Sequence, residues 1–87
     1  GLTCAEAYII RAEEHSVRVI PAPFRRAEQI VLDMKNYPQL SPEHPLTVRA
    51  LDRDGRLLDK QTIPYREKLE LDISRGPFAL QLQSLPE

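Results

Sequence analysis

The feature that most constrains the fold of this chain is an alternation of apolar and polar side chains with a period of two. Residues 68–73 alternate charged side chains with leucine or isoleucine, and residues 78–83 alternate large apolar side chains with alanine or glutamine. Such alternation is typical of a β-strand that buries one face and exposes the other. We therefore expect short two-faced strands, with Phe78 at the head of the last one and in the core.

Turn-forming residues divide the chain into segments of strand length. Asp54-Gly55 stands between two strand-like runs, and this dipeptide is a strong hairpin signal because glycine tolerates the positive φ of a tight turn. Gly76-Pro77 marks a second turn, and the eight prolines lack the amide donor that an inner strand needs. The strands are predicted near residues 5–12, 16–21, 28–35, 46–52, 56–63, 67–73 and 78–84.

The segment near residues 24–36 fits two kinds of structure. As a helix it gathers Phe24, Val31 and Met34 in one apolar stripe but leaves Leu32 on the polar side. As a strand it points Leu32 and Met34 the same way but leaves Val31 on the polar side. We favour the strand because the segments on both sides are strands of similar length. An α+β fold with one helix in this segment is the alternative.

The length of 87 residues fits one domain spanning residues 1–87, which can be one module of a longer chain. With 41% hydrophobic and 29% charged residues, the composition is that of an ordered domain rather than of a disordered chain. About seven short antiparallel strands with turn signals between them predict an all-β fold, a sandwich of two sheets.

Three stretches in the C-terminal half resemble the closing strands of immunoglobulin-like and fibronectin type III-like modules. Residues 46–58 hold a strand, an Asp-x-Asp-Gly turn and a second strand, residues 69–73 form a leucine-x-leucine strand, and residues 76–82 join a glycine to an aromatic-led strand. The chain lacks the tryptophan and the cysteine pair of antibody domains. The resemblance implies an immunoglobulin-like β-sandwich that serves as a non-catalytic accessory or linker module of a larger protein.

Charge and hydrophobicity limit the partners of the chain. The net charge is −1, so we expect no nucleic-acid partner. The apolar runs are only two or three residues long, as in Ile30-Val31-Leu32, and we expect no membrane insertion. A single cysteine, Cys4, excludes an internal disulfide bond and leaves the cellular compartment open.

Metal binding has two weak candidates in the sequence. Asp52, Asp54 and Gly55 could begin a calcium loop, but Arg56 would repel the ion and a hairpin turn explains the same residues. Cys4, His15 and His44 are too far apart to form the paired ligands of a zinc site. We therefore predict no metal and no cofactor.

The sequence contains no recognisable catalytic motif. Ser16 follows His15, but neighbouring residues of a strand point to opposite faces and cannot form a nucleophile and base pair. The carboxylates Glu70 and Asp72 alternate with leucine, which is the pattern of a solvated strand face. Three scattered glycines cannot build a phosphate-binding loop. We therefore expect that the chain is not an enzyme.

The remaining candidates concern binding. Arg25-Arg26 beside Phe24 is the one local basic and aromatic cluster, and we interpret it as a charged rim or a guarded edge. Tyr37 and Tyr65 adjoin prolines, and carbohydrate binding by them has no further support. The predicted function is a non-catalytic structural or interaction module that spaces, orients or docks neighbouring domains or a protein partner. The alternative is a small stand-alone α+β binding protein or oligomer subunit.

Overall fold

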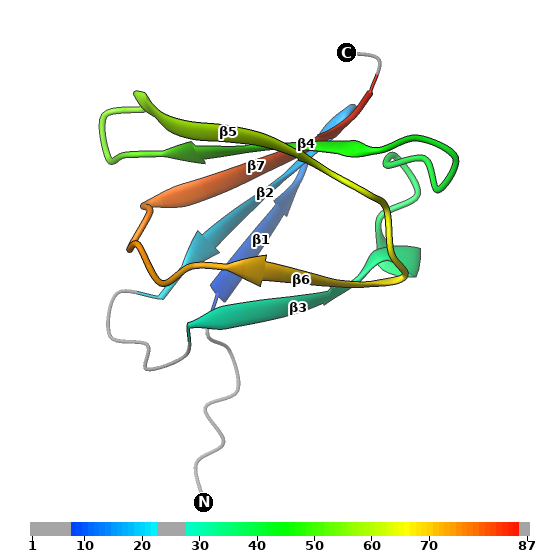
Figure 1. Cartoon of the computed structure of the whole chain (residues 1–87), viewed down its shortest axis with the longest axis horizontal. Coiled ribbons are helices and arrows are strands. Elements are labelled where there is room, and N and C mark those ends of the chain that lie inside the picture. The colour runs from blue at the N-terminus through cyan, green and yellow to red at the C-terminus, as the bar shows by residue number, and fades with distance from the viewer. Residues whose placement is uncertain (1–7, 23–27, 86–87) are drawn as a thin grey trace, which may run out of the picture.

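The computed structural model describes residues 8–22 and 28–85, which form strands and one short 3₁₀ turn (Figure 1). The turn, η1, spans Met34–Asn36. The strands are β1 (Tyr8–Ala12), β2 (Ser16–Pro21), β3 (Gln29–Asp33), β4 (Leu46–Leu51), β5 (Leu57–Ile63), β6 (Lys68–Asp72) and β7 (Ala79–Ser84). Each lies within one of the predicted ranges, so the all-β prediction is confirmed for the described residues.

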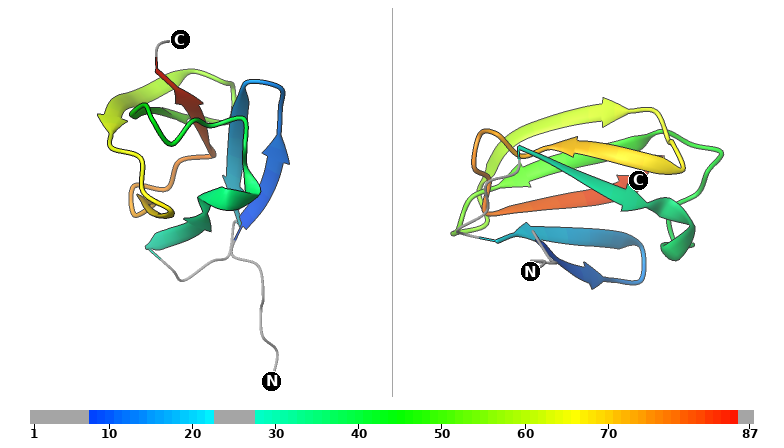
Figure 2. Two further views of the ribbon diagram at one scale, coloured as in Figure 1. Left: turned by 90° about the vertical axis from the view of Figure 1, so that its right-hand side faces the viewer. Right: turned by 90° about the horizontal axis from the view of Figure 1, so that it is seen from below.

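The strands form two antiparallel sheets of unequal size. The large sheet has the order β1-β2-β7-β4-β5, and the small sheet pairs β3 with β6. Figure 2 shows the small sheet lying against one face of the large, strongly twisted sheet. The arrangement is compatible with a β-sandwich, although β2 pairs with β7 here, whereas the second strand pairs with the fifth in the constant-type immunoglobulin sheet.

The alternative of a helix near residues 24–36 is wrong for residues 29–33, which form β3. Ile30 and Leu32 are buried between the sheets, and Val31 is 51% exposed on the opposite face. A helix would have placed Leu32 on a solvated side, so burial of two alternating residues favours the strand. Residues 24–27 lie outside the described part of the chain.

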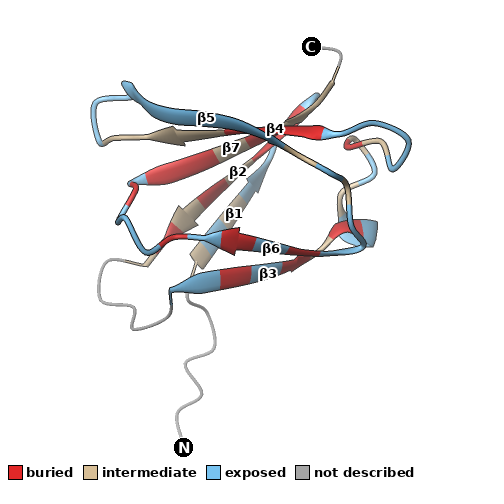
Figure 3. Cartoon of the chain, viewed as in Figure 1, coloured by how far each residue is buried: buried red, intermediate tan, exposed pale blue. Residues whose placement is uncertain are grey.

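The core fills the space between the two sheets (Figure 3). In the large sheet the core is formed by alternate residues of β2, β4 and β7, all on the face that is turned toward the small sheet. This is the burial that the two-faced pattern predicts. These residues are Val17, Val19, Leu46, Val48, Leu80 and Leu82. The facing side chains of the small sheet are Ile30, Leu32, Leu69 and Leu71. By contrast, nearly all of β5 is exposed.

Both predicted turns are present, and Gly55 has the positive φ that the hairpin prediction required. Gly55 has φ +85° and Gly76 has φ +70°. The Asp52 carboxylate accepts hydrogen bonds from the backbone N–H groups of Asp54 (2.9 Å) and Arg56 (2.8 Å). This carboxylate therefore holds the β4–β5 turn together, which supports the hairpin interpretation over a calcium loop.

The prediction that Phe78 lies in the core is wrong. Its side chain is 44% exposed, and the Arg53 guanidinium lies 5.9 Å from the centre of its ring. The strand β7 begins only at Ala79, one residue after Phe78. Phe78 therefore falls in the turn after Gly76-Pro77 and outside the alternation that buries Leu80.

Candidate docking surfaces

The histidines and the cysteine considered as metal ligands are not brought together in the described residues. His15 lies in the exposed β1–β2 turn with its Nε2 atom 3.2 Å from a carboxylate oxygen of Glu14. His44 is exposed in the loop before β4. Cys4 lies outside the described residues. Across residues 8–22 and 28–85, no three histidine, cysteine, aspartate or glutamate side chains gather as ligands.

The other candidates have equally plain positions. The Ser16 hydroxyl donates a hydrogen bond to the Glu13 carboxylate at 2.8 Å across the β1–β2 turn. Tyr37 and Tyr65 are half-buried and pack against the core instead of forming an exposed aromatic platform. The Phe24–Arg26 cluster lies outside the described residues. No helix in the described ranges has the length and hydrophobicity to cross a bilayer.

The first surface is the outer face of the large sheet, which is the face turned away from the small sheet. The strand register places Arg11 of β1 opposite Arg18 of β2, and Arg18 opposite Gln81 of β7. On the other side, Gln81 pairs with Arg49 of β4, and Arg49 pairs with Lys60 of β5. Four cations therefore share one row that crosses all five strands, and we call it the cation row.

None of the described strands contributes a carboxylate to the outer face, and at one end of the face the Glu13 carboxylate accepts the hydrogen bond from Ser16. The residues of the described strands that share this face are otherwise apolar, hydroxyl or amide side chains. They are Ile9, Ser16, Ile20, Thr47, Leu51, Leu57, Thr62, Ala79, Gln81 and Gln83. Without the four cations of the row, the chain has eight lysine and arginine residues against thirteen acidic residues. The near-zero net charge thus conceals a strongly basic face.

Polar atoms on the outer face are incompletely paired within the chain. Arg49 donates a hydrogen bond from Nη1 to Oε1 of Gln83 at 3.3 Å. The buried Nε of Arg18 and the buried Oγ1 of Thr47 have no hydrogen-bond partner, and no other buried side-chain nitrogen or oxygen of the described residues shares this state. Because buried polar groups are nearly always paired, two unpaired ones on a single face set it apart.

The outer face of the small sheet has the opposite charge. Asp33, Glu70 and Asp72 project from it, with Lys68 as the cation among the facing strand residues. The hydrogen bond from the Lys68 ammonium to the Asp33 carboxylate (3.0 Å) lowers the pKa of Asp33 below its ordinary value of 3.8. Hydrogen bonds from Ser74 lower the pKa of Asp72 in the same direction. The two outer faces therefore make the molecule electrically polar.

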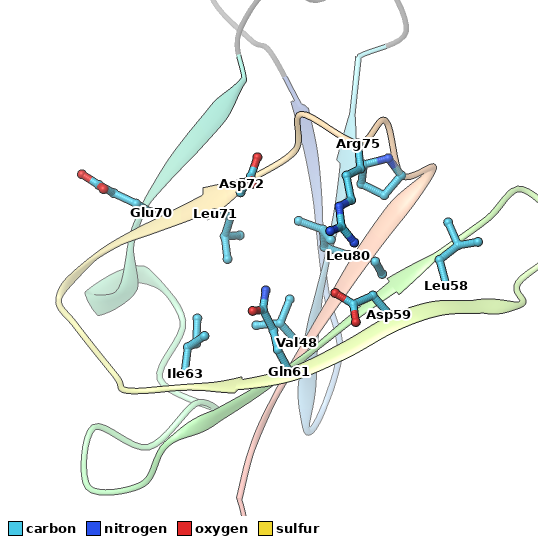
Figure 4. Close-up of a pocket in the computed structure, with 12 residues that line it drawn as sticks. Val48, Leu58, Asp59, Gln61, Ile63, Glu70, Leu71, Asp72, Arg75 and Leu80 are labelled. Carbon is cyan, nitrogen blue, oxygen red and sulfur yellow. The ribbon is translucent and has the colours of Figure 1, made fainter.

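The second surface is a groove between β5 and β6 (Figure 4). It lies where the small sheet does not cover β5, the edge strand of the large sheet. Its volume is about 590 Å³, and Val48, Ala50, Leu71 and Leu80 contribute apolar surface to it. The residues that β5 contributes are Leu58, Asp59, Gln61 and Ile63. We call this the β5–β6 groove. A hollow of this size with mixed apolar and charged walls can hold part of another molecule.

Sequence reasoning missed both surfaces, although half of the signal for the first was present. Arg18 lies between Val17 and Val19, and Arg49 lies between Val48 and Ala50, so alternation already turned both arginines away from the core. Their alignment in one row depends on which strands are neighbours, and the alternation carries no information about that order.

Comparison of the chain with family models, with curated proteins and with solved structures finds no match. Function therefore has to be argued from the surfaces themselves.

Proposed function

We propose that this chain is a non-catalytic docking module that holds an acidic surface of a protein partner, or of a neighbouring domain of the same chain, against the outer face of its large sheet. The resemblance of residues 46–82 to immunoglobulin-like and fibronectin type III-like modules points in the same direction, because such modules commonly serve as accessory domains. The proposal assigns the chain no reaction and no cofactor.

The observation that carries this proposal is the cation row. Arg18 of β2 and Arg49 of β4 lie on either side of Gln81, which is on β7 between them. Arg11 and Lys60 extend the row to the two edges of the sheet. Strands in a sheet are about 4.8 Å apart, so the row presents a dense line of positive charge on a rigid support. Like charges that face each other on neighbouring strands repel. A carboxylate of a partner would reduce this repulsion.

The unpaired polar atoms support the same conclusion. Arg18 is half-buried, and its Nε lacks an acceptor within the chain. Arginine offers five N–H donors in a planar fork that fits a carboxylate, and two such donors can bind both carboxylate oxygens. An acidic partner would offer carboxylate acceptors to the guanidinium and ammonium groups of the row. The apolar Ile9 and Leu57, both exposed at the sheet edges, would add contact area at the rim.

The experiment is a titration of the ¹⁵N-labelled chain with poly-L-glutamate, followed by amide chemical shifts. We expect the largest shifts in β2, β7 and β4, and an affinity that falls as salt is added. The double variant Arg18→Gln/Arg49→Gln should bind at least about tenfold more weakly, because two charge-assisted hydrogen bonds are lost. If that variant unfolds, Arg11→Gln/Lys60→Gln, at two exposed positions, tests the same row.

The matched control is Arg56→Gln/Arg66→Gln, which removes the same charge from two exposed positions away from the row. Equal weakening by the control and the test variant would mean that binding follows net charge alone, and the proposal would then be wrong. Tighter binding of a single-stranded oligonucleotide than of poly-L-glutamate would also contradict it, since that result assigns the row to a nucleic acid.

A further inference from the structure

The outer face of the large sheet carries a second row of side chains beside the cation row. This row also crosses all five strands, and every member is apolar. Its members are Ile9 of β1, Ile20 of β2, Ala79 of β7, Leu51 of β4 and Leu57 of β5. Three of the four neighbour relations are direct pairs in the register, and the fourth, Ile20 beside Ala79, follows the last β2–β7 pair by one position. We call it the apolar row.

Both ends of the apolar row are open to solvent. Ile9 is 64% exposed and Leu57 is 55% exposed. Ile20 and Leu51 are half-buried, and Ala79 at the centre of the row is buried. Five large apolar side chains of the described residues are exposed, and two of them lie in this row. Apolar side chains that line up in water on one face are typical of a contact surface.

The cation row has different neighbours on its two sides. Residues on one face of a strand are two positions apart, so the apolar row lies about 6.7 Å from the cation row. On the other side is a row of hydroxyl and amide side chains, with the Glu13 carboxylate at its end. Glu13 would repel an acidic partner on that side, whereas the apolar row carries no charge. A partner therefore gains most contact when an apolar surface adjoins its acidic surface.

The backbone of the large sheet favours a helical partner over an extended one. The N–H and C=O groups of β2, β7 and β4 lie in the plane of the sheet and pair with the strands on both sides. An extended segment on the outer face would find no ladder partner there, whereas an α-helix pairs its backbone groups internally. The rows cross five strands and are about 19 Å long, which equals about 13 residues of helix. A helix about 10 Å wide would cover both rows.

We propose that the outer face of the large sheet binds an amphipathic α-helix of a protein partner. An acidic stripe of this helix lies against the cation row, and the adjacent apolar stripe lies against the apolar row. The helix axis therefore runs along the rows and crosses the strands. This inference rests on the docking function proposed above, and it adds the secondary structure and the side-chain pattern of the partner.

The probe is a synthetic peptide of about 18 residues, a length at which an alanine-rich peptide forms a helix. Leucine recurs in it at spacings of three and four, a glutamate follows each leucine, and alanine fills the remaining positions. The two stripes are then adjacent, because consecutive residues of a helix are about 100° apart. The control peptide has the same composition, with leucine and glutamate spread around the helix, and circular dichroism checks that the two are equally helical.

The ¹⁵N-labelled full chain is titrated with both peptides. The striped peptide should bind at least about tenfold more tightly than the control peptide, because the apolar contact adds to the ionic one only when the stripes are adjacent. The shifted amides should include those of the apolar row on β1 and β5 as well as those of the cation row. Arg18→Gln/Arg49→Gln should weaken binding of the striped peptide, as it weakens that of poly-L-glutamate.

A double variant separates the two rows. Ile9→Ser/Leu57→Ser should weaken binding of the striped peptide at least about tenfold and change that of poly-L-glutamate by less than about twofold, since the cations remain. The matched control is Val31→Ser/Leu58→Ser, at two side chains of similar exposure, 51% and 59%, on other surfaces. It should leave binding of the striped peptide within about twofold.

A change in the peptide serves as a second test if Ile9→Ser/Leu57→Ser unfolds the chain. Replacing the leucines of the striped peptide by alanine removes the same contact from the side of the partner, and it should weaken binding at least about tenfold.

The helix proposal and the docking proposal fail in different ways. If poly-L-glutamate binds the cation row but the striped peptide binds no more tightly than the control peptide, the helix proposal is wrong and the docking proposal remains. If neither peptide nor poly-L-glutamate binds, both are wrong. Equal weakening by the two serine double variants would overturn the helix proposal, since binding would then follow exposed apolar surface in general. Displacement of the striped peptide by vesicles of anionic lipid at a lower concentration would overturn it too, because the face would then belong to a membrane surface.

Discussion

β7 and β5 belong to the same sheet and are separated only by β4, yet β7 is buried and β5 is exposed. β7 pairs with β2 and β4 and faces the small sheet, which buries Leu80 and Leu82. β5 pairs only with β4, and Leu58, which lines the β5–β6 groove, is 59% exposed. The two-stranded sheet is too narrow to cover five strands, so the sandwich closes around β7 and stays open at β5. Stability resides in the closed part, and the open part is available for contact.

The largest expected difference between the two strands is in the cost of removing a leucine. Leu82→Ala should lower the free energy of unfolding by about 2–5 kcal/mol, because the fully buried side chain leaves a cavity between the sheets. Leu58→Ala should cost about 1 kcal/mol or less, because more than half of that side chain is already in water. Urea unfolding of the two variants measures both values. Similar costs would show that β5 is buried as deeply as β7.

The contrast between these strands also shows how far the sequence determines the fold. Alternation and turn residues located every described strand, since both signals are local. The partition into five and two strands was not predictable in this way, because it depends on pairing between segments as distant as β2 and β7. The cation row depends on the same long-range register, and the net charge of −1 pointed away from a basic surface. The β5–β6 groove exists only because of the unequal partition.

A smaller difference is expected at a cross-strand pair of threonines on the outer face. Thr47 of β4 and Thr62 of β5 are direct partners in the register, but Thr47 is fully buried with an unpaired hydroxyl, whereas Thr62 is exposed. Thr47→Val keeps the shape and removes a buried unpaired hydroxyl, so it should raise the free energy of unfolding by about 1 kcal/mol. Thr62→Val should change it by no more than about 0.5 kcal/mol.

Urea unfolding of the two threonine variants makes this comparison directly. Destabilisation by Thr47→Val would mean that the hydroxyl has an acceptor in solution, and the outer face would then be better satisfied than the structure indicates. A gain in stability from Thr62→Val equal to that from Thr47→Val would remove the difference between the centre and the edge of the sheet.

The smallest expected effect concerns the small sheet, whose acidic face borders the open part of the sandwich. The pKa of Asp33 is lowered by its hydrogen bond from Lys68, and that of Asp72 by hydrogen bonds from Ser74. A carboxylate with a depressed pKa stabilises the folded state above its unfolded pKa, 3.8 here, and this contribution is lost as the pH falls below 3.8 through the folded value. Asp72 is exposed and Asp33 is only half-buried, so solvent screens both groups and the contribution is small. The free energy of unfolding, measured by urea between pH 5 and pH 2, should therefore fall less in Asp33→Asn/Asp72→Asn than in the unmodified chain.

The control is Glu43→Gln, in the loop before β4, whose stability should fall with pH as it does in the unmodified chain. If the stability of the double variant falls as steeply as that of the unmodified chain, these hydrogen bonds do not favour the ionised carboxylates.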